Sequence, residues 1–160
     1  MNAVIEAEHL RKTFGTLVAL DDLSFSALSG ECVGLLGPNG AGKTSTIRMV
    51  YGFSPPTSGS LKVFGLDVTR DYREVKARIG VCHQENNLDP ELTVLQNLVV
   101  FARYFDIPRA EAEHRSRELL KFMALEHRER SRTVSLSGGM ARRLVIARAL
   151  LNRPELLILD

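Results

Sequence analysis

The chain has 160 residues, of which 44% are hydrophobic and 25% are charged, and its formal net charge is +2. This composition is typical of one globular domain, and so small a net charge gives no reason to expect a nucleic acid or an anionic membrane surface as partner. No stretch comes near the roughly 18 consecutive apolar residues of a membrane-spanning helix, and the first ten residues do not look like a secretion signal. Cys32 and Cys82 lie in apolar runs, so we expect small buried hydrophobes in a reducing compartment and no disulfide.

The first third of the chain predicts strands and one helix. Segments 3–10 and 20–28 alternate apolar and polar residues, which is typical of half-buried antiparallel strands. Segment 31–37, ECVGLLG, is apolar on both faces, which predicts a strand buried on both sides, as in a parallel sheet. A glycine-rich turn follows it, and segment 43–52 then has the apolar spacing of a helix that ends at Gly52.

Further along, segments 60–68 and 78–84 predict two more strands, separated from the first helix by the loop SPPTSG. From Thr93 the pattern becomes helical, and Thr93 with Gln96 forms a capping-box pair. A second helix is expected over about residues 108–125 and a third after Ser137. The expected apolar faces of these three helices are Val94, Leu98, Phe101 and Phe105; Leu119, Phe122 and Met123; and Met140, Leu144, Ala147 and Leu151.

The last segment, ELLILD at 155–160, predicts a fully buried strand. A core strand therefore returns after the helices, which makes residues 86–136 a helical insertion into an α/β core. The expected fold class is α/β, with a mostly parallel core sheet and a smaller antiparallel layer at the N-terminus.

The strongest motif is Gly37–Thr44, which matches G-x-x-x-x-G-K-[ST] and lies between a predicted buried strand and a helix. Glycines let backbone N–H groups turn inward around an anion, and the helix N-terminus adds partial positive charge. Lys43 would reach the β- and γ-phosphates of a nucleotide and the Thr44 hydroxyl would ligate Mg²⁺. The alternative is a chance glycine-rich turn, which would arise on the order of once in a few hundred chains.

A second motif, LSGG at Leu136–Gly139, stands at the predicted start of a helix. By itself it could be an ordinary N-cap, because serine is a good capping residue. Its Ser137 lies 94 residues after Lys43 (137 minus 43), and a hydrophobic strand that ends in Asp160 follows. The combination is far more informative than the four residues alone.

Together these segments resemble the nucleotide-binding domain of ATP-binding cassette (ABC) transporters over essentially the whole chain. GPNGAGKT is similar to Walker A, Gln84 in GVCHQEN to the Q-loop, LSGGM to the signature and LLILD to Walker B. Phe14 matches the aromatic position that stacks on adenine, although an ordinary core phenylalanine is the alternative reading. Three positions depart from the common pattern: His83 where many members have Pro, Met140 where many have Gln, and Phe14 where Tyr is commoner.

The resemblance implies a P-loop NTPase core, an N-terminal antiparallel β-subdomain and a helical subdomain, with further C-terminal strands missing. The expected divisions of this single, partial domain are about 1–29 for the β-subdomain, 30–85 for the P-loop core, 86–136 for the helical subdomain and 137–160 for the signature helix and Walker B strand. The implied ligands are ATP and Mg²⁺. Implied site residues are Lys43, Gln84 and Asp160 for catalysis; Phe14, Gly37, Asn39, Gly40, Ala41, Gly42, Lys43, Thr44 and Ser45 for the nucleotide; Ser137, Gly138 and Gly139 for ATP on the opposite subunit; and Thr44, Gln84 and Asp160 for the metal.

The resemblance also implies partners. Two cassettes would form a head-to-tail homodimer, and membrane permease subunits would hold it at the cytoplasmic face without insertion of this chain. LSGGMARRL and NNLDPELTV look most like exporters of the drug-resistance and nodulation-factor type.

In the family, a glutamate that polarises the attacking water follows the Walker B aspartate. These 160 residues alone are therefore expected to hydrolyse ATP negligibly. They are also expected to be unstable, because in the family a further strand inserts between the Walker A and Walker B strands, and without it unpaired backbone groups and apolar strand edges are left exposed. The alternatives are a remnant that binds ATP without cleaving it, a non-transport ABC ATPase of the DNA-repair or translation kind, and a P-loop kinase or GTPase. The spacing of 94 residues leaves no room for the coiled coil of repair members, and a kinase or GTPase would have no reason to carry Leu136–Gly139 after Gln84.

Overall fold

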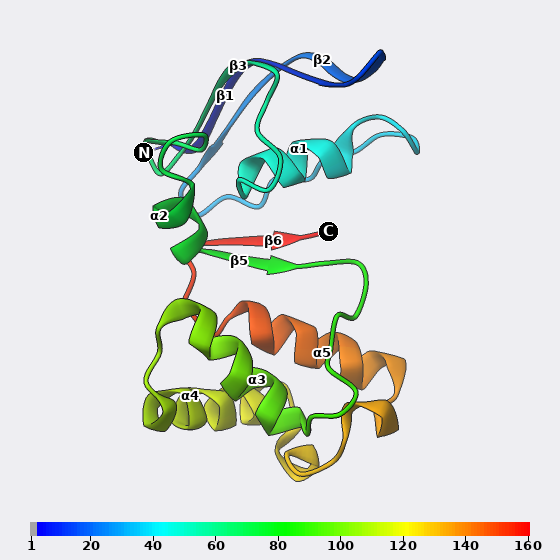
Figure 1. The fold of residues 1–160 in the computed structure, drawn as a ribbon, viewed down its shortest axis with the longest axis vertical. Helices are drawn as coiled ribbons and strands as arrows, with labels where there is room; N and C mark the ends of the chain where they lie inside the picture. The colour runs from blue at the N-terminus through cyan, green and yellow to red at the C-terminus, as the bar shows by residue number, and fades with distance from the viewer. Residues whose placement is uncertain (1–2) are drawn as a thin grey trace. The chain divides into compact units, whose positions relative to one another are not determined.

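The computed structural model describes residues 3–160, which divide into two compact units with a boundary between Lys76 and Ala77. The first unit contains β1 (Ala3–Phe14), β2 (Leu17–Leu28), α1 (Lys43–Val50), β3 (Ser58–Val63), β4 (Leu66–Asp67) and α2 (Tyr72–Ala77), which ends at the boundary. The second contains β5 (Ile79–Cys82), α3 (Val94–Ala102), η1 (Arg103–Phe105), α4 (Arg109–Phe122), η2 (Glu126–Arg128), η3 (Thr133–Ser135), α5 (Gly138–Ala149) and β6 (Leu156–Leu159). Figure 1 shows both sets of elements.

The first unit is an antiparallel sheet in the order β2-β1-β3-β4, and α1 packs against β2 and β3 (Figure 1). Along β1, Ile5 and Ala7 are buried while the glutamates between and after them are exposed. A bulge between Ala7 and Leu10, where His9 has φ 48°, turns Leu10 back into the core in spite of the odd spacing. The prediction of half-buried antiparallel strands is confirmed.

The second unit has a two-stranded parallel sheet, β5 beside β6, and α5 covers it (Figure 1). Cys82 packs against Val145 and Ala149 of that helix. The approach is so close at Gly80 that a Cβ there would collide with the carbonyl oxygen of Ala149, so no larger residue fits. Burial raises the pKa of the Cys82 thiol, which is therefore a neutral core side chain.

The three longest helices of this unit share one apolar core. Thr93 begins α3 with the predicted capping box: its hydroxyl accepts from the N–H of Gln96, and the Gln96 side chain accepts from the N–H of Thr93. Pro108 precedes α4, as predicted. The buried residues of this core are Val94, Leu98, Ala102, Ala112, Leu120, Leu125, Leu144, Ala147 and Leu151.

Several expectations are wrong in detail. Residues 31–38 form no strand, Leu36 is 96% exposed, and Cys32 is exposed. A strand needs a neighbour for its N–H and C=O groups, and neither sheet of residues 3–160 places one beside this segment. Likewise β6 pairs with β5 alone among the described strands, so it is only half covered and Leu159 is 61% exposed.

Two further differences are local. Segment 60–68 is a hairpin of β3 and β4 and not one strand, because Phe64 and Gly65 adopt positive φ and turn the chain. Phe122 does not lie on the apolar side of α4 but is 76% exposed. That helix meets its neighbours through the small residues Ala112 and Ser116 together with Leu120, while Leu119 and Met123 pack at the margin.

No helix among residues 3–160 combines the length and the apolar character that crossing a bilayer requires.

Candidate nucleotide site

The glycine-rich loop has a backbone shape that favours glycine. Gly40 and Gly42 have φ of 85° and 84°, in the left-handed region, and Gly42 is the N-cap of α1. A Cβ at Gly42 would lie 2.6 Å from the carbonyl oxygen of Ala19 on β2, whereas a Cβ at Gly40 would meet open space. The loop therefore turns at Gly42 directly against the sheet, and the helix starts there.

Lys43 bends back over this loop. Its Nζ donates to the carbonyl oxygens of Gly37, at 2.7 Å, and Pro38, at 2.8 Å, and the N–H of Ala41 donates to the same Pro38 oxygen at 3.2 Å. The side chain of Thr46, which is buried, donates to Gly42 at 3.0 Å and ties the first turn to the loop. The cation of Lys43 is thus held over the loop that precedes its helix.

The start of α1 adds donors to this arrangement. The first N–H groups of a helix have no carbonyl partner within the helix, and they carry the positive end of the helix dipole. In α1 these are the N–H groups of Lys43, Thr44 and Ser45, and the Thr44 side chain is exposed. Left-handed glycines, free helical N–H groups and a lysine cation fit a polyphosphate.

Phe14 ends β1, opposite Leu17 in the hairpin, and its side chain is 52% exposed. The ammonium of Lys12 lies 5.0 Å from the centre of its ring and also donates to the carbonyl oxygen of Pro55 at 2.6 Å. Phe14 is therefore not a core residue of the first unit. It offers an accessible aromatic face of the kind on which a base can stack.

In the second unit, Gln84 and Asp160 follow the ends of β5 and β6 at the same edge of the small sheet. Parallel β5 and β6 end at the paired residues Cys82 and Leu159, and the N–H of Asp160 donates to the carbonyl oxygen of Cys82 at 3.0 Å. Gln84 is exposed and Asp160 is half-buried. This is the carboxyl edge of parallel strands, where α/β proteins place ligands.

The residues Ser137, Gly138 and Gly139 form the start of α5. Ser137 is its N-cap, and the serine hydroxyl accepts from the N–H of Met140 at 3.3 Å. Gly138 and Gly139 are exposed and carry no side chain that would cover the helix N-terminus. Met140 is half-buried and packs on the helical core, so its departure from the common glutamine adds apolar contact.

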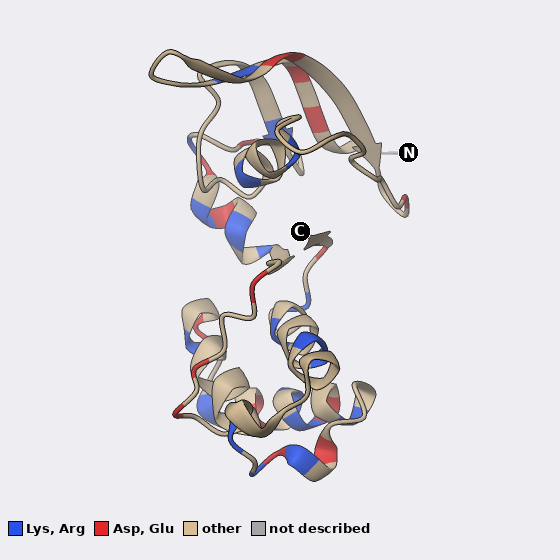
Figure 2. Ribbon diagram, turned by 90° about the vertical axis from the view of Figure 1, so that its right-hand side faces the viewer, with Lys and Arg blue, Asp and Glu red and all other residues tan. Residues whose placement is uncertain are grey.

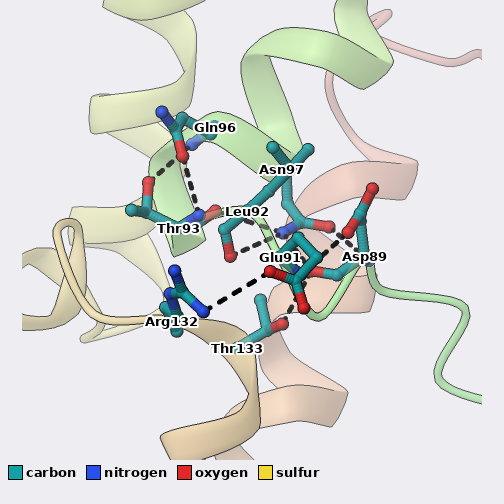
Figure 3. A network of polar contacts seen from close by, with 8 residues as sticks. All are labelled: Asp89, Glu91, Leu92, Thr93, Gln96, Asn97, Arg132 and Thr133. Atoms are coloured by element: carbon teal, nitrogen blue, oxygen red, sulfur yellow. Dashed lines mark hydrogen bonds and ion pairs between the residues drawn. The ribbon is translucent and has the colours of Figure 1, made fainter.

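The loop from Gln84 to α3 is held by a buried amide that sequence reasoning missed (Figure 3). Asn97 accepts from the N–H of Asp89 at 2.8 Å, and its Nδ2 donates to the carbonyl oxygens of Asp89 and Thr93 at 3.0 and 3.1 Å. Thr133 donates to the same Asp89 oxygen at 2.8 Å. The chain between β5 and α3 is thus fixed to the helical core by side chains that meet its main chain.

Two arginines of α5 were also missed. Arg142 donates to the carbonyl oxygen of His83 and, at 3.4 Å, to that of Asp160. Arg148 is only 9% exposed and donates to the carbonyl oxygen of Asn87. A signal existed for Arg142, because residues 142, 145 and 149 share one face of a helix and the last two cover Cys82.

Charges elsewhere are balanced. Lys and Arg alternate with Asp and Glu along the helices of the second unit (Figure 2). Arg130 and Arg132 are exposed, and their side chains lie 3.9 Å from the carboxylate of Glu129 and 3.5 Å from that of Glu91. Within residues 3–160, no three His, Cys, Asp or Glu side chains gather to hold a metal. Mg²⁺ bound with a nucleotide needs few protein ligands, so a nucleotide-bound Mg²⁺ does not require such a group.

The glycine-rich loop before α1, the acid at the carboxyl edge of parallel strands and the capped glycine pair at the start of α5 are the features that resemble an ABC nucleotide-binding domain, and the family comparison agrees with that resemblance. Residues 20–160 match the model of the family described as ABC transporter, so the chain belongs to the ABC transporter family.

Among its relatives are two proteins named Nod factor export ATP-binding protein I. The one from Paraburkholderia xenovorans (strain LB400) is 47% identical over 158 residues, which are 99% of this chain and 52% of the relative. The one from Rhizobium johnstonii (strain DSM 114642 / LMG 32736 / 3841) is 46% identical over 156 residues, 98% of this chain and 50% of the relative. The chain therefore spans about half the length of the curated relatives it matches.

Solved structures agree with the fold. An ATP-binding subunit of an ABC transporter has a TM-score of 0.86 at 30% identity and covers 98% of this chain and 65% of its own. A dimeric ATP-binding cassette in a post-hydrolysis state with ADP and Pi has a TM-score of 0.87 at 27% identity, over 98% of this chain and 73% of its own. The α/β class and the P-loop fold expected from the sequence are thus confirmed.

Proposed function

We propose that this chain is the ATP-binding part of an ABC exporter, which binds ATP with Mg²⁺ and couples its hydrolysis to transport through membrane subunits. The observation that carries the proposal is the loop at Gly37–Thr44, with left-handed glycines and Lys43 held over it at the start of α1. Family membership and relatives named for export support it.

Each residue has a role that follows from its chemistry. Lys43 exchanges the carbonyl oxygens of Gly37 and Pro38 for β- and γ-phosphate oxygens, and the N–H groups at residues 40–45 surround the rest of the phosphate chain. Bound Mg²⁺ supplies charge neutralisation at the phosphates. The Thr44 hydroxyl and the Asp160 carboxylate would hold that ion, the latter through water, and Gln84 would orient the attacking water near it.

The adenine and the second subunit complete the proposed site. Phe14 presents its exposed ring for stacking, and Gly37, Asn39, Gly40, Ala41 and Ser45 shape the phosphate pocket. The capped, uncovered start of α5 at Ser137–Gly139 suits the γ-phosphate of ATP on a second cassette in a head-to-tail homodimer. The dimeric cassette among the similar structures supports this partner.

We further propose a position at the cytoplasmic face of the membrane, held there by permease subunits that the helical subdomain, about residues 86–136, would meet. The divisions at about residues 29, 85 and 136 remain part of this proposal. We also propose that residues 1–160 in isolation hydrolyse ATP negligibly, because the resemblance places the water-polarising glutamate directly after Asp160.

The test is nucleotide binding and phosphate release by the protein at its natural length. With Mg²⁺, we expect ATP binding and turnover that Lys43→Ala lowers by about a hundredfold or more, since a lost phosphate contact of a charged group removes several kcal/mol. Arg70→Ala, an exposed cation of the same unit, is the control and should change neither. Wild-type protein that binds ATP no better than Lys43→Ala does would sink the proposal.

A further inference from the structure

The segment that carries Gln84 is held by its main chain. Three carbonyl oxygens along it each accept from a side chain of the helical part of the unit: His83 from Arg142, Asn87 from Arg148, and Asp89 from Asn97 and Thr133. The side chain of Gln84 is exposed between the first two of these anchors. Its position is therefore set by residues far away in the sequence.

Two of the anchors stand on α5, the helix that begins at Ser137. Arg142 lies in its second turn and reaches the residue before Gln84, and it also reaches Asp160 at 3.4 Å. Arg148 lies near its end and reaches the residue three positions after Gln84. One helix thus holds the Gln84 segment on both sides and also touches the end of β6.

Arg148 is costly to place where it is. It is almost fully buried, its guanidinium donates to a carbonyl oxygen and lies 4.8 Å from the centre of the Phe101 ring, and both of these partners are neutral. Burial lowers the pKa of Arg148, but an arginine side chain stays protonated in proteins, so the buried group carries a positive charge. A buried charge without an opposite charge destabilises a protein, so such a residue points to a purpose other than stability.

We infer that Arg142 and Arg148 are positioning residues for Gln84: they fix its main chain to α5, so that the start of α5 and Gln84 move as one body. The inference rests on the proposed function, in which Ser137–Gly139 meet the nucleotide of a second cassette. A shift of α5 on dimerisation then carries Gln84 with it. ATP on one subunit and the water-orienting amide of the other are joined by a single rigid helix.

The same helix provides a matched control. Arg143 is half-buried and donates to the carbonyl oxygen of Met123, at 2.6 Å, in the segment after α4. Arg143→Met therefore removes the same kind of side chain and the same kind of hydrogen bond from the same helix, but it leaves the Gln84 segment untouched. Arg148→Lys keeps the charge and loses the fork of donors.

The first measurement is amide hydrogen exchange in residues 83–89 of the natural-length protein, without nucleotide. In Arg148→Met and Arg142→Met we expect exchange there to become about tenfold to a hundredfold faster, because each hydrogen bond from a charged donor is lost. Arg143→Met should leave this segment at the wild-type rate, and Arg148→Lys should lie in between. Unchanged exchange in both Met variants, or an equal rise in Arg143→Met, would overturn the inference.

The second measurement is steady-state ATP hydrolysis. We expect Arg148→Met to lower kcat by about 10- to 100-fold while the affinity for ATP stays within about twofold, because Gln84 is displaced and the loop at Lys43 is intact. A loss of affinity with unchanged kcat would contradict a positioning role. If Arg148→Met does not fold, Arg148→Lys and Arg142→Met decide the question by the same readouts.

The two proposals fail differently. Wild-type protein without turnover that depends on Lys43 refutes the proposed function, yet hydrogen exchange in residues 83–89 still reports whether the arginines hold the segment. Turnover that depends on Lys43 but is equally reduced in Arg143→Met and Arg148→Met refutes only the positioning role.

Discussion

The two loops proposed to serve ATP, residues 37–44 and 83–92, are held in shape by different parts of the polypeptide. The first is held by its own residues: left-handed Gly40 and Gly42, and a lysine that donates to two carbonyl oxygens of the same loop. The second is held from outside, by Asn97, Thr133 and two arginines that reach its main chain from α3, η3 and α5. The conformation of residues 37–44 can be predicted from eight consecutive residues. The conformation of residues 83–92 cannot, because the side chains that hold it lie elsewhere in the sequence.

This difference predicts how each loop fails. A self-held loop should be broken by changes of backbone freedom within it and by little else. A loop held from outside should tolerate changes of its own side chains and break when distant polar residues change. Substitutions in the two loops and their supports test this contrast, and their expected effects range from about 3 kcal/mol down to a small shift in melting temperature.

Gly42→Ala should have the largest effect. Its left-handed φ strains an alanine by about 1–2 kcal/mol, and the added methyl group meets the Ala19 carbonyl oxygen at 2.6 Å, so we expect about 3 kcal/mol in total and loss of measurable ATP binding. Gly40 has nearly the same φ, but a Cβ there would meet open space, so Gly40→Ala should cost only the backbone strain of about 1–2 kcal/mol. Calorimetric ATP titration and thermal melting measure both; equal effects of the two variants would contradict a loop pressed against β2.

Asn97→Asp should destabilise the second unit by about 2–3 kcal/mol, because a carboxylate replaces the donor that faces the carbonyl oxygens of Asp89 and Thr93. Gln96→Glu is the matched amide-to-acid control. The Gln96 oxygen accepts from the N–H of Thr93 at a helix start, and a carboxylate does so equally well. Urea unfolding should separate the two variants clearly, and similar midpoints would show that Asn97 is not the anchor.

Thr133→Val should cost about 1 kcal/mol, since it removes only the hydroxyl that donates to the Asp89 oxygen at 2.8 Å. Thr133→Ser keeps this hydroxyl and loses a methyl group. In urea unfolding and in hydrogen exchange of residues 86–92, we expect the serine variant to resemble the wild type more closely. The reverse order would mean that packing, and not the hydrogen bond, holds this end of the loop.

The smallest effect concerns an exposed ion pair of the first unit, between His9 of β1 and Asp22 of β2. The hydrogen bond and the charge of Asp22 raise the pKa of His9, whose Nδ1 lies 2.6 Å from the carboxylate. A raised pKa in the folded state means that the pair stabilises the fold below the ordinary histidine value near 6.5, and that this contribution is lost as pH rises through the folded pKa.

Melting of wild-type protein and Asp22→Asn at pH 5.5 and 8.5 checks the sign. Asparagine tolerates the positive φ of residue 22, so the comparison isolates the charge. The wild type should melt slightly higher at the lower pH only. A difference that is larger at pH 8.5 would contradict the pairing.

The features that could be predicted from the sequence are those held by contacts between residues close together in the chain. The cap of α3 at Thr93, the N-cap of α5 at Ser137 and the turn at Gly42 were predictable because their partners lie within a few residues. The absence of a strand at 31–37 was not predictable, because an apolar sequence favours a buried strand only where neighbouring strands are present to pair with it. The prediction that Phe122 lies on the apolar side of α4 was wrong because it relied on large apolar residues. The buried face of that helix instead includes the small residues Ala112 and Ser116.

The same limit explains the site. Gln84 and Asp160 could be named from motifs, and their positions at the same sheet edge follow from the parallel pairing of β5 and β6. Arg148 could not be assigned, because nothing near it in the sequence marks Asn87 as its partner, 61 residues away. Among residues 3–160, the sequence suggested candidate ATP-binding groups through its motifs, but it did not reveal the side chains that hold the main chain around Gln84.

Since the arginines of α5 meet carbonyl oxygens, they do not read which amino acids the loop contains. Every residue has a carbonyl oxygen, so Glu85, Asn86 and Asn87 can be exchanged in evolution without loss of either anchor. The surface that this loop offers to other molecules is then free to diversify, while its path stays fixed.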